Sequence, residues 1–260
     1  MCSMEYLQLF GIDIGIQMVG WVISSVFHTE KHFDLFGSLT YILLILRSYN
    51  KNKPTTLSRQ SLSTGMVMIW ALRLGCFLFY RVLASGEDKR FENVRSDPSA
   101  FLVYWFVQSL WVFFTLFPAL VVNIEQKQQR QLIITDHLGV ALWVVGFMFE
   151  VIADYQKTQF RSDPLNKDNF ISTGLWSISR HPNYFGEVVL WIGVTLLATS
   201  AFSGWKWIGL LSPGFVYLLL NFVSGIPILE ASGLKKFGHL PAYQEYLHSV
   251  PVFLPIWGSR

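Results

Sequence analysis

The sequence has few charged residues and no long run of one charge sign. Aspartate, glutamate, lysine and arginine make up 14% of its 260 residues, whereas hydrophobic residues make up 52% and aromatic residues 16%. Soluble domains contain about 25% charged residues, so this composition excludes an ordinary soluble domain and is typical of a membrane protein. The net charge of +3 is scattered among apolar segments, and we therefore expect no nucleic-acid partner.

The sequence also lacks a disulfide framework, a metal-binding pattern and the start of a signal peptide. Cys2 and Cys76 are its only cysteines, too few for a disulfide framework or a cysteine-based zinc site. The histidines lie too far apart to suggest a metal set, so we predict no metal. The first 27 residues contain Glu5 and Asp13 but no lysine or arginine, whereas a signal peptide begins with positive charge. We expect an uncleaved first helix.

Long apolar runs dominate what is present. A membrane-spanning helix needs about 20 apolar residues, and backbone in lipid must satisfy its own hydrogen bonds. The sequence therefore predicts an all-α, polytopic membrane helix bundle of about seven transmembrane helices, with residues 1–260 forming a single domain. Six spans is the alternative, because the second run is short and Pro213 and Pro227 interrupt the last one. The predicted helices cover residues 6–27, 33–46, 62–84, 100–122, 137–155, 184–202 and 205–229.

The distribution of lysine and arginine predicts the orientation of these helices. With the N-terminus outside, more basic residues fall on the cytoplasmic side than on the other side, although the basic loop 47–59 opposes this bias. We expect a multi-pass protein of the endoplasmic reticulum or another internal membrane, with its C-terminus in the cytoplasm. The sequence does not indicate an oligomeric state.

Residues 174–187 contain the densest chemistry of the chain, Gly-Leu-Trp-Ser-Ile-Ser-Arg-His-Pro-Asn-Tyr-Phe-Gly-Glu. The proline after Arg180 and His181 suits the first turn of a helix, which has no use for its missing N–H. Asn183 and Glu187 are four residues apart and share a helix face. Because the free amides of a helix N-terminus attract negative charge, the stretch predicts an anion-binding pocket at the membrane surface.

A second group of polar residues ends the fifth predicted helix. Spaced by four, three and four positions, these residues share one helix face: Glu150, Asp154, Lys157 and Arg161. Acids at membrane depth indicate a functional site, although a helix end that pairs its own charges at the interface would look the same. The loop that follows, with Asn169, returns to Arg180. Its amides could bind ribose or carboxamide groups, and the two arginines could bind phosphates.

Arg73 lies near the middle of the third predicted helix. A cation at that depth costs at least about 2.5 kcal/mol and therefore needs a partner. Glu187, Glu150 or a ligand could provide it, and a purely structural ion pair is the alternative.

Residues 174–187 resemble the C-terminal domain of the steroid 5-alpha-reductase superfamily, and specifically its DUF1295 branch. The resemblance extends to residues 72–91, 153–160 and the C-terminal tail from Lys236 to Pro255. It implies that NADPH binds on the cytoplasmic side of a seven-helix bundle, through Asp154, Arg161, Asn183 and Glu187. Adding the loop residues and the motif tyrosine, we predict this cofactor-binding set: Asp154, Arg161, Asn169, Arg180, Asn183, Tyr184 and Glu187.

The sequence departs from the characterised steroid reductases at the groups that polarise the substrate. Those enzymes carry a Gln-Glu pair in the second helix and a tyrosine in the third, whereas this sequence has no such pair and places Arg73 at the tyrosine position. An arginine can also stabilise an enolate oxygen. We predict a reductase that passes hydride from NADPH to an activated C=C bond of a lipid or steroid-like substrate entering from the bilayer, with Arg73 or Tyr80 as the catalytic group.

Two other classes of protein fit the same residues. The Arg-His-Pro-x-Tyr-x-Gly motif, followed by a tail with Glu230, Phe-Gly and two tyrosines, also resembles the isoprenylcysteine and phospholipid methyltransferases. Those enzymes bind S-adenosylmethionine and usually have two consecutive glutamates where only Glu230 stands here. A non-catalytic lipid-binding membrane protein is the third alternative.

Overall fold

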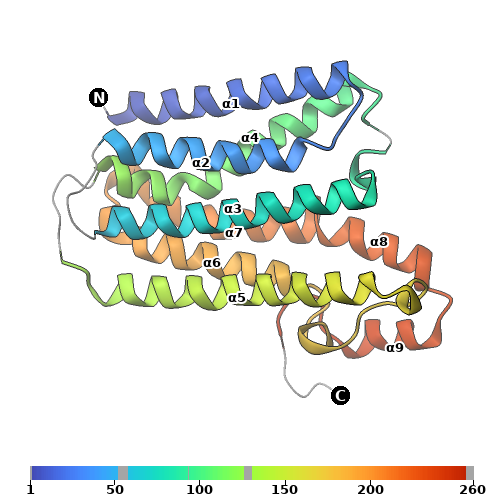
Figure 1. Cartoon of the computed structure of the whole chain (residues 1–260). Coiled ribbons are helices and arrows are strands. Elements are labelled where there is room, and N and C mark those ends of the chain that lie inside the picture. Colours follow the sequence, from blue (N-terminus) through green and yellow to red (C-terminus); the bar gives the residue numbers. More distant parts are fainter. Residues whose placement is uncertain (1, 52–57, 93, 126–130, 256–260) are drawn as a thin grey trace. The chain divides into compact units, whose positions relative to one another are not determined.

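The computed structural model describes residues 2–51, 58–92, 94–125 and 131–255. Within these ranges the chain forms helices and no strand, as the sequence predicts (Figure 1). The α-helices are α1 (Cys2–Val26), α2 (Phe33–Lys51), α3 (Arg59–Ser85), α4 (Pro98–Glu125), α5 (Ile134–Ser162), α6 (Pro182–Ala198), α7 (Ser212–Leu218), α8 (Ile226–Phe237) and α9 (Pro241–Ser249). Shorter turns join them: the 3-10 helices η1 (Lys89–Phe91), η2 (Pro164–Asn166), η3 (Gly174–Ser177), η4 (Thr199–Ala201) and η5 (Gly204–Leu211), and the π-helix η6 (Leu219–Val223).

Six helical segments in the described ranges are long and apolar enough to cross a membrane, so the chain is an integral, multi-pass membrane protein. This number equals the alternative that the sequence left open. The seventh long helix, α2, is not one of the six, because Asp34, Arg47 and Lys51 make its two ends polar. The six segments are Ser3–Val26, Arg59–Ser85, Pro98–Glu125, Ile134–Ser162, Pro182–Ala201 and Gly204–Phe237.

The last apolar segment is broken where the sequence places its prolines. Pro213 lies in the first turn of α7, and Pro227 lies in the first turn of α8. Between these helices the chain forms the π-helix η6 and then turns at Ser224 and Gly225. A proline in a first helical turn costs no hydrogen bond, whereas one further inside kinks or breaks the helix, so short helices that begin near Pro213 and Pro227 suit these two prolines.

The residues fall into two compact units, and each is described by itself. Unit 1 comprises Met1–His137 and Val194–Ser212, and unit 2 comprises Leu138–Gly193 and Pro213–Arg260. The boundaries fall within α5 and α6 and at the start of α7.

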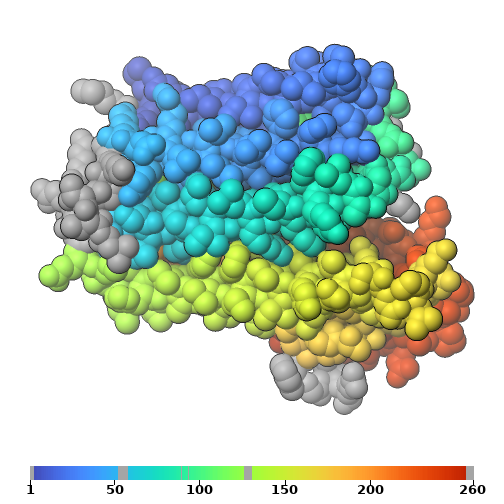
Figure 2. Space-filling model, in the orientation of Figure 1, coloured from blue at the N-terminus to red at the C-terminus, as the bar shows by residue number. Residues whose placement is uncertain are grey.

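In unit 1, helices α1, α2 and α3 lie side by side and present one face in the space-filling view (Figures 1 and 2). An aromatic cluster of Phe33, Phe91, Phe101 and Trp105 packs inside this unit. Some polar groups inside it are paired across helices: the Gln17 amide donates to the Thr40 hydroxyl at 3.1 Å and accepts from the Gln108 amide at 2.8 Å. These bonds satisfy polar groups that lipid could not.

Unit 1 also contains a fully buried ion pair at the start of α3. Arg59 Nε donates to Asp136 Oδ1 at 2.6 Å, and Arg59 Nη2 donates to Asp136 Oδ2 and to the Gln131 carbonyl. Asp136 Oδ2 also accepts from the Ile133 N–H at 2.7 Å. Both side chains are at most 2% exposed, so this pair has the two-point geometry and the extra hydrogen bonds that a buried charge requires.

In unit 2, glycines bring α5 and α6 into close backbone contact. A Cβ atom on Gly186 would lie 2.5 Å from the Gly146 carbonyl oxygen, and one on Gly193 would lie 2.5 Å from the Gly139 carbonyl oxygen. The two glycines are seven residues apart on each helix and pair in reverse order, so the helices run antiparallel. This contact places the last turns of α5 beside the first turns of α6, where the polar residues predicted from the sequence lie.

Candidate functional site

The candidate site surrounds the N-terminus of α6, which begins at Pro182 as the sequence predicts. The C-terminal tail fixes the residues before it. The Arg180 N–H donates to the Pro251 carbonyl at 2.9 Å, and the Ser179 hydroxyl donates to the Phe253 carbonyl at 2.9 Å. The tail thereby holds Arg180 and His181 at the helix entrance.

A glutamate from α8 joins the two residues at that entrance. His181 Nε2 donates to Glu230 Oε1 at 2.8 Å, and Arg180 Nη1 lies 3.0 Å from Glu230 Oε2. The side chains of His181, Arg180 and Glu230 are 5%, 12% and 23% exposed. One carboxylate therefore orients both an imidazole and a guanidinium, and only the carboxylate has substantial access to solvent.

The protonation state of His181 follows from its surroundings. Burial lowers the pKa of His181 below its ordinary value, against the opposing effect of the Glu230 hydrogen bond. The neutral ring carries its proton on Nε2, because a carboxylate can only accept. Nδ1 is then an acceptor, and within the described part of the chain this buried atom has no hydrogen-bond partner. It can accept a hydrogen bond from a ligand.

A second buried acceptor lies on Asn183, two residues after His181 and in the first turn of α6. Asn183 Nδ2 donates to Asp154 Oδ1 of α5 at 3.2 Å, so the structure brings together two residues of the predicted cofactor set. This hydrogen bond orients the amide and uses its nitrogen, so the amide oxygen stays available as an acceptor. Asn183 Oδ1 is buried, and no residue that the structure describes donates to it. A buried polar atom without a partner is costly unless a ligand or water completes it.

Residues 174–176 pack onto α5 and position a cation near the same helix end. Gly174 has a positive φ of 62°, which favours glycine, and a Cβ atom there would lie 2.5 Å from the Gln156 amide nitrogen. Trp176 Nε1 donates to the Ala153 carbonyl at 3.0 Å, and the Lys157 ammonium lies 4.3 Å from the centre of the Trp176 ring. This cation–π contact holds the ammonium of Lys157 on the Trp176 side of α5.

Helix α9 supports this arrangement from the other side. The Tyr246 hydroxyl donates to the Trp176 carbonyl at 2.8 Å. Burial raises the pKa of Tyr246 above its ordinary value, so the hydroxyl stays protonated and keeps donating at physiological pH. Tyr246 is thereby a structural donor that fixes Trp176.

The other predicted cofactor residues lie in unit 2 with different degrees of burial. The Tyr184 ring stacks parallel to the His181 ring at 5.7 Å, and Glu187 is buried on α6. Arg161 is exposed at the end of α5. Asn169 is also exposed, and its amide donates to the Leu165 carbonyl at 3.3 Å within its own loop. The buried part of the predicted set is thus the part at the α5–α6 contact.

Arg73 and Tyr80, the predicted catalytic residues, belong to α3 in unit 1, whereas the site described above lies wholly within unit 2. The Arg73 guanidinium lies 5.2 Å from the centre of the Phe77 ring. Tyr80 is 67% exposed. Their catalytic roles stay predictions.

The predicted cofactor-binding set did not include His181 and Glu230, although the structure pairs them at the start of α6. The two residues are 49 positions apart, so no local spacing could join them. The available signal was the methyltransferase resemblance, which singles out both the His-Pro motif and a glutamate in the tail.

The comparison with known proteins identifies the family. The model of a family described as protein of unknown function (DUF1295) matches residues 20–250. The match covers most of the chain, which therefore belongs to this family, as its resemblance predicted. Searches of the curated proteins and of the solved structures each found no match. The family description assigns no activity.

Proposed function

We propose that this protein is a membrane reductase that uses NADPH to reduce an activated C=C bond of a lipid or steroid-like substrate. The observation that carries the proposal is the pair of buried acceptors without partners in the described chain, His181 Nδ1 and Asn183 Oδ1, at a helix N-terminus beside Arg180. A dinucleotide has complementary groups, because its hydroxyls and carboxamide N–H groups donate and its phosphates are anionic.

The residues of unit 2 fit such a cofactor. Arg180 and Lys157 would hold phosphates, since both are cations near the start of α6. Asn183, His181 and the Asp154 carboxylate would accept from ribose hydroxyls or the carboxamide. The N-terminal amides of α6 would add to the attraction for negative charge.

When bound, NADPH supplies a hydride to the β carbon of the activated double bond, and a proton from water or a protein acid is added to the α carbon. The chain has to orient the substrate and stabilise the negative charge on its carbonyl oxygen, and Arg73 or Tyr80 is proposed for that stabilisation. An apolar substrate would enter from the bilayer. We place the cofactor site at the cytoplasmic surface of the endoplasmic reticulum or another internal membrane.

Ligand-dependent stability of the detergent-solubilised protein tests cofactor binding. A ligand at 100 times its Kd should stabilise the folded state by about 2.7 kcal/mol, so we expect NADPH to raise Tm. Asn183→Ala should weaken NADPH binding by about 10-fold, because it removes an oriented polar contact in a buried site. Asn166→Ala is the matched control, since the Asn166 amide donates to the nearby Phe160 carbonyl. Equal NADPH affinity in the parent and Asn183→Ala would place the cofactor elsewhere.

The role of Arg73 needs a separate test, with a steroid enone as the probe substrate. Arg73→Met keeps the apolar length of the side chain and removes its charge. If Arg73 stabilises the oxygen, the variant should fold, bind NADPH and lose about 100-fold in turnover, the scale for one oxyanion donor. Parent-like turnover in a folded Arg73→Met protein would contradict this role. Tyr80 would then be the remaining candidate, and Tyr80→Phe would test it.

A specific contact favours a second candidate, a methyltransferase that uses S-adenosylmethionine. The paired Arg180 and Glu230 carry the charges that would bind the carboxylate and ammonium of its amino-acid end. In that case S-adenosylmethionine, and not NADPH, should raise Tm, and Glu230→Gln should reduce this rise in Tm. Stabilisation by neither ligand would favour a non-catalytic lipid-binding protein.

A further inference from the structure

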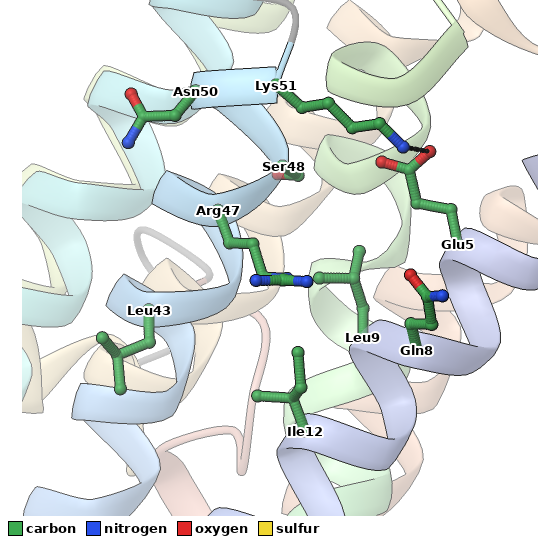
Figure 3. A pocket seen from close by; sticks show the side chains of 9 residues that line it. All are labelled: Glu5, Gln8, Leu9, Ile12, Leu43, Arg47, Ser48, Asn50 and Lys51. Carbon is green, nitrogen blue, oxygen red and sulfur yellow. Dashed lines mark hydrogen bonds and ion pairs between the residues drawn. The ribbon is translucent and has the colours of Figure 1, made fainter.

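Unit 1 contains a groove that the site in unit 2 does not use. It lies between the N-terminal half of α1 and the C-terminal half of α2 and has a volume of about 690 Å³ (Figure 3). Pockets that hold small ligands have volumes of roughly 300–1,000 Å³. The groove is lined by Glu5, Gln8, Leu9, Ile12, Leu43, Arg47, Ser48, Asn50 and Lys51.

The two walls of the groove are stripes of residues on facing helices. On α2, Leu43, Arg47 and Lys51 follow one another at four-residue spacing and so share one face. Glu5, Leu9 and Ile12 form the corresponding stripe on α1. Lys51 Nζ lies 2.7 Å from Glu5 Oε2, so an ion pair joins the two walls at one end.

The lining changes from apolar to charged along the groove. Ile12 and Leu43 lie at one end in Figure 3, the ion pair of Lys51 and Glu5 lies at the other, and the Arg47 guanidinium lies between them. The charged end coincides with the start of α1, where this membrane-spanning helix reaches the headgroup region. This order matches that of a phospholipid, from acyl chain to phosphate.

The charges of the groove favour an anionic occupant. Arg47 and Lys51 provide two positive charges and Glu5 provides one negative charge, so the lining is net positive. Lys51 and Glu5 already pair with each other. Arg47 is exposed, and within the described ranges no ion pair or hydrogen bond engages its side chain. A guanidinium binds phosphate oxygens at two points, and basic side chains at a membrane surface attract anionic lipids.

We propose that this groove binds an anionic glycerophospholipid, with its phosphate on Arg47 and an acyl chain against Leu9, Ile12 and Leu43. A zwitterionic lipid should bind less well, because its ammonium would meet a net positive lining whose single acid is already paired. An arginine that merely extends to the interface would need no hollow beneath it. The inference concerns unit 1 alone and does not depend on the proposed reductase activity.

The test titrates phosphatidylglycerol or phosphatidylcholine into the full-length protein in detergent and measures Tm, with bound lipid counted by native mass spectrometry. The parent should bind phosphatidylglycerol in preference to phosphatidylcholine. Arg47→Gln should lower its affinity for phosphatidylglycerol by about 10-fold, the scale of one charge-assisted hydrogen bond. Arg47→Lys should retain part of the preference. Lys235→Gln removes an exposed charge from α8 in unit 2 and should leave the preference unchanged.

A second variant tests the apolar end of the groove. Leu43 is 52% exposed, so Leu43→Trp can fill the groove without disturbing the core, and it should weaken binding of both lipids. The proposal would be overturned if phosphatidylglycerol stabilised the parent, Arg47→Gln and Leu43→Trp equally, since that describes annular lipid. It would also be overturned if glycerol 3-phosphate bound as tightly as the lipid, or if Arg47→Gln changed the oligomeric state, since the groove would then hold a free phosphate or a second copy.

Discussion

Each unit contains a buried charged cluster, and the two clusters differ in how completely their hydrogen bonds are formed. In unit 1, Arg59 and Asp136 are almost fully buried, and the pair meets at two points with added backbone hydrogen bonds. In unit 2, the Glu230 carboxylate contacts both Arg180 and His181. This triad is partly open to solvent and leaves His181 Nδ1 without a partner in the described chain. A buried pair whose hydrogen bonds are complete leaves no polar atom for a ligand, whereas a pair with an unpartnered polar atom can bind one.

Both charged clusters lie at the starts of helices. Arg59 follows the N-cap Ser58 at the start of α3, and Asp136 lies in the first turn of α5. Both are near helix N-termini, where amide groups help to satisfy a carboxylate. In unit 2, by contrast, His181 precedes α6, and the amides of its first turn lack an intrahelical acceptor.

Breaking the pair in unit 1 should have the largest effect on stability. Asp136→Ala would leave the Arg59 guanidinium buried without its counter-charge, which typically costs about 3 to 5 kcal/mol. We expect the variant to unfold at much lower temperature or denaturant concentration than the parent. Ligand affinity in unit 2, measured on the folded fraction, should not change.

The double variant Arg59→Met/Asp136→Leu is the control for this prediction. It replaces the pair by apolar side chains of similar volume, which is often neutral for a buried pair, so most of the lost stability should return. A double variant as unstable as Asp136→Ala would show that the charges themselves, and not the unpaired guanidinium, determine stability at this position.

Breaking the pair in unit 2 should affect binding more than stability. Glu230→Gln keeps an acceptor for His181 Nε2 and removes the counter-charge of Arg180. Because the Glu230 side chain is 23% exposed, we expect a stability loss of only about 1 kcal/mol. Affinity for the ligand of the site, measured by thermal shift, should change by about 10-fold. A large stability loss with unchanged affinity would make this a structural pair like that of unit 1.

The sequence predicted the local features of both units better than their pairings. The helix start at Pro182, the breaks at Pro213 and Pro227 and the shared face of Asp154 and Lys157 all follow from local rules of spacing and backbone geometry. Hydropathy placed the helix cores but not their ends: α5 continues to Ser162, because its polar last turns lie beyond the apolar run and are still helical.

The long-range pairings could not be predicted from one sequence. Arg59 and Asp136 are 77 positions apart, and nothing in the spacing of either residue selects the other. The contact between Gly146 and Gly186 depends on the angle at which α5 and α6 pack. Since the candidate site is built on that contact, its members were identifiable one by one, but their arrangement was not.

The burial of His181 should make the stability of the protein depend on pH. Burial holds the pKa of His181 below the value of about 6.5 that it has in the unfolded chain. As pH falls through 6.5, the unfolded state therefore takes up a proton that the folded state does not, and stability decreases by at most about 1.4 kcal/mol per pH unit for this one group. The decrease ends below the folded-state pKa.

Denaturant unfolding between pH 7.5 and 5.5 measures this effect. The slope of stability against pH should be smaller in His181→Gln, which cannot titrate and whose amide can still donate to Glu230. His239→Gln is the matched control, because it makes the same substitution at an exposed histidine. Identical slopes in the parent and His181→Gln would mean that His181 is equally protonated in both states.

The smallest effect is expected at the support beneath the site. Tyr246→Phe removes the hydrogen bond to the Trp176 carbonyl and keeps the ring, so we expect a stability loss of about 0.5 to 1.5 kcal/mol. Because Trp176 carries the Lys157 cation–π contact, ligand affinity should decrease slightly as well. Tyr155→Phe is the matched control, since Tyr155 is 63% exposed on α5 and its hydroxyl has no hydrogen bond among the described residues. If both tyrosine variants were equally stable and bound ligand equally well, the Trp176 carbonyl would be satisfied by water, and α9 would not position the site.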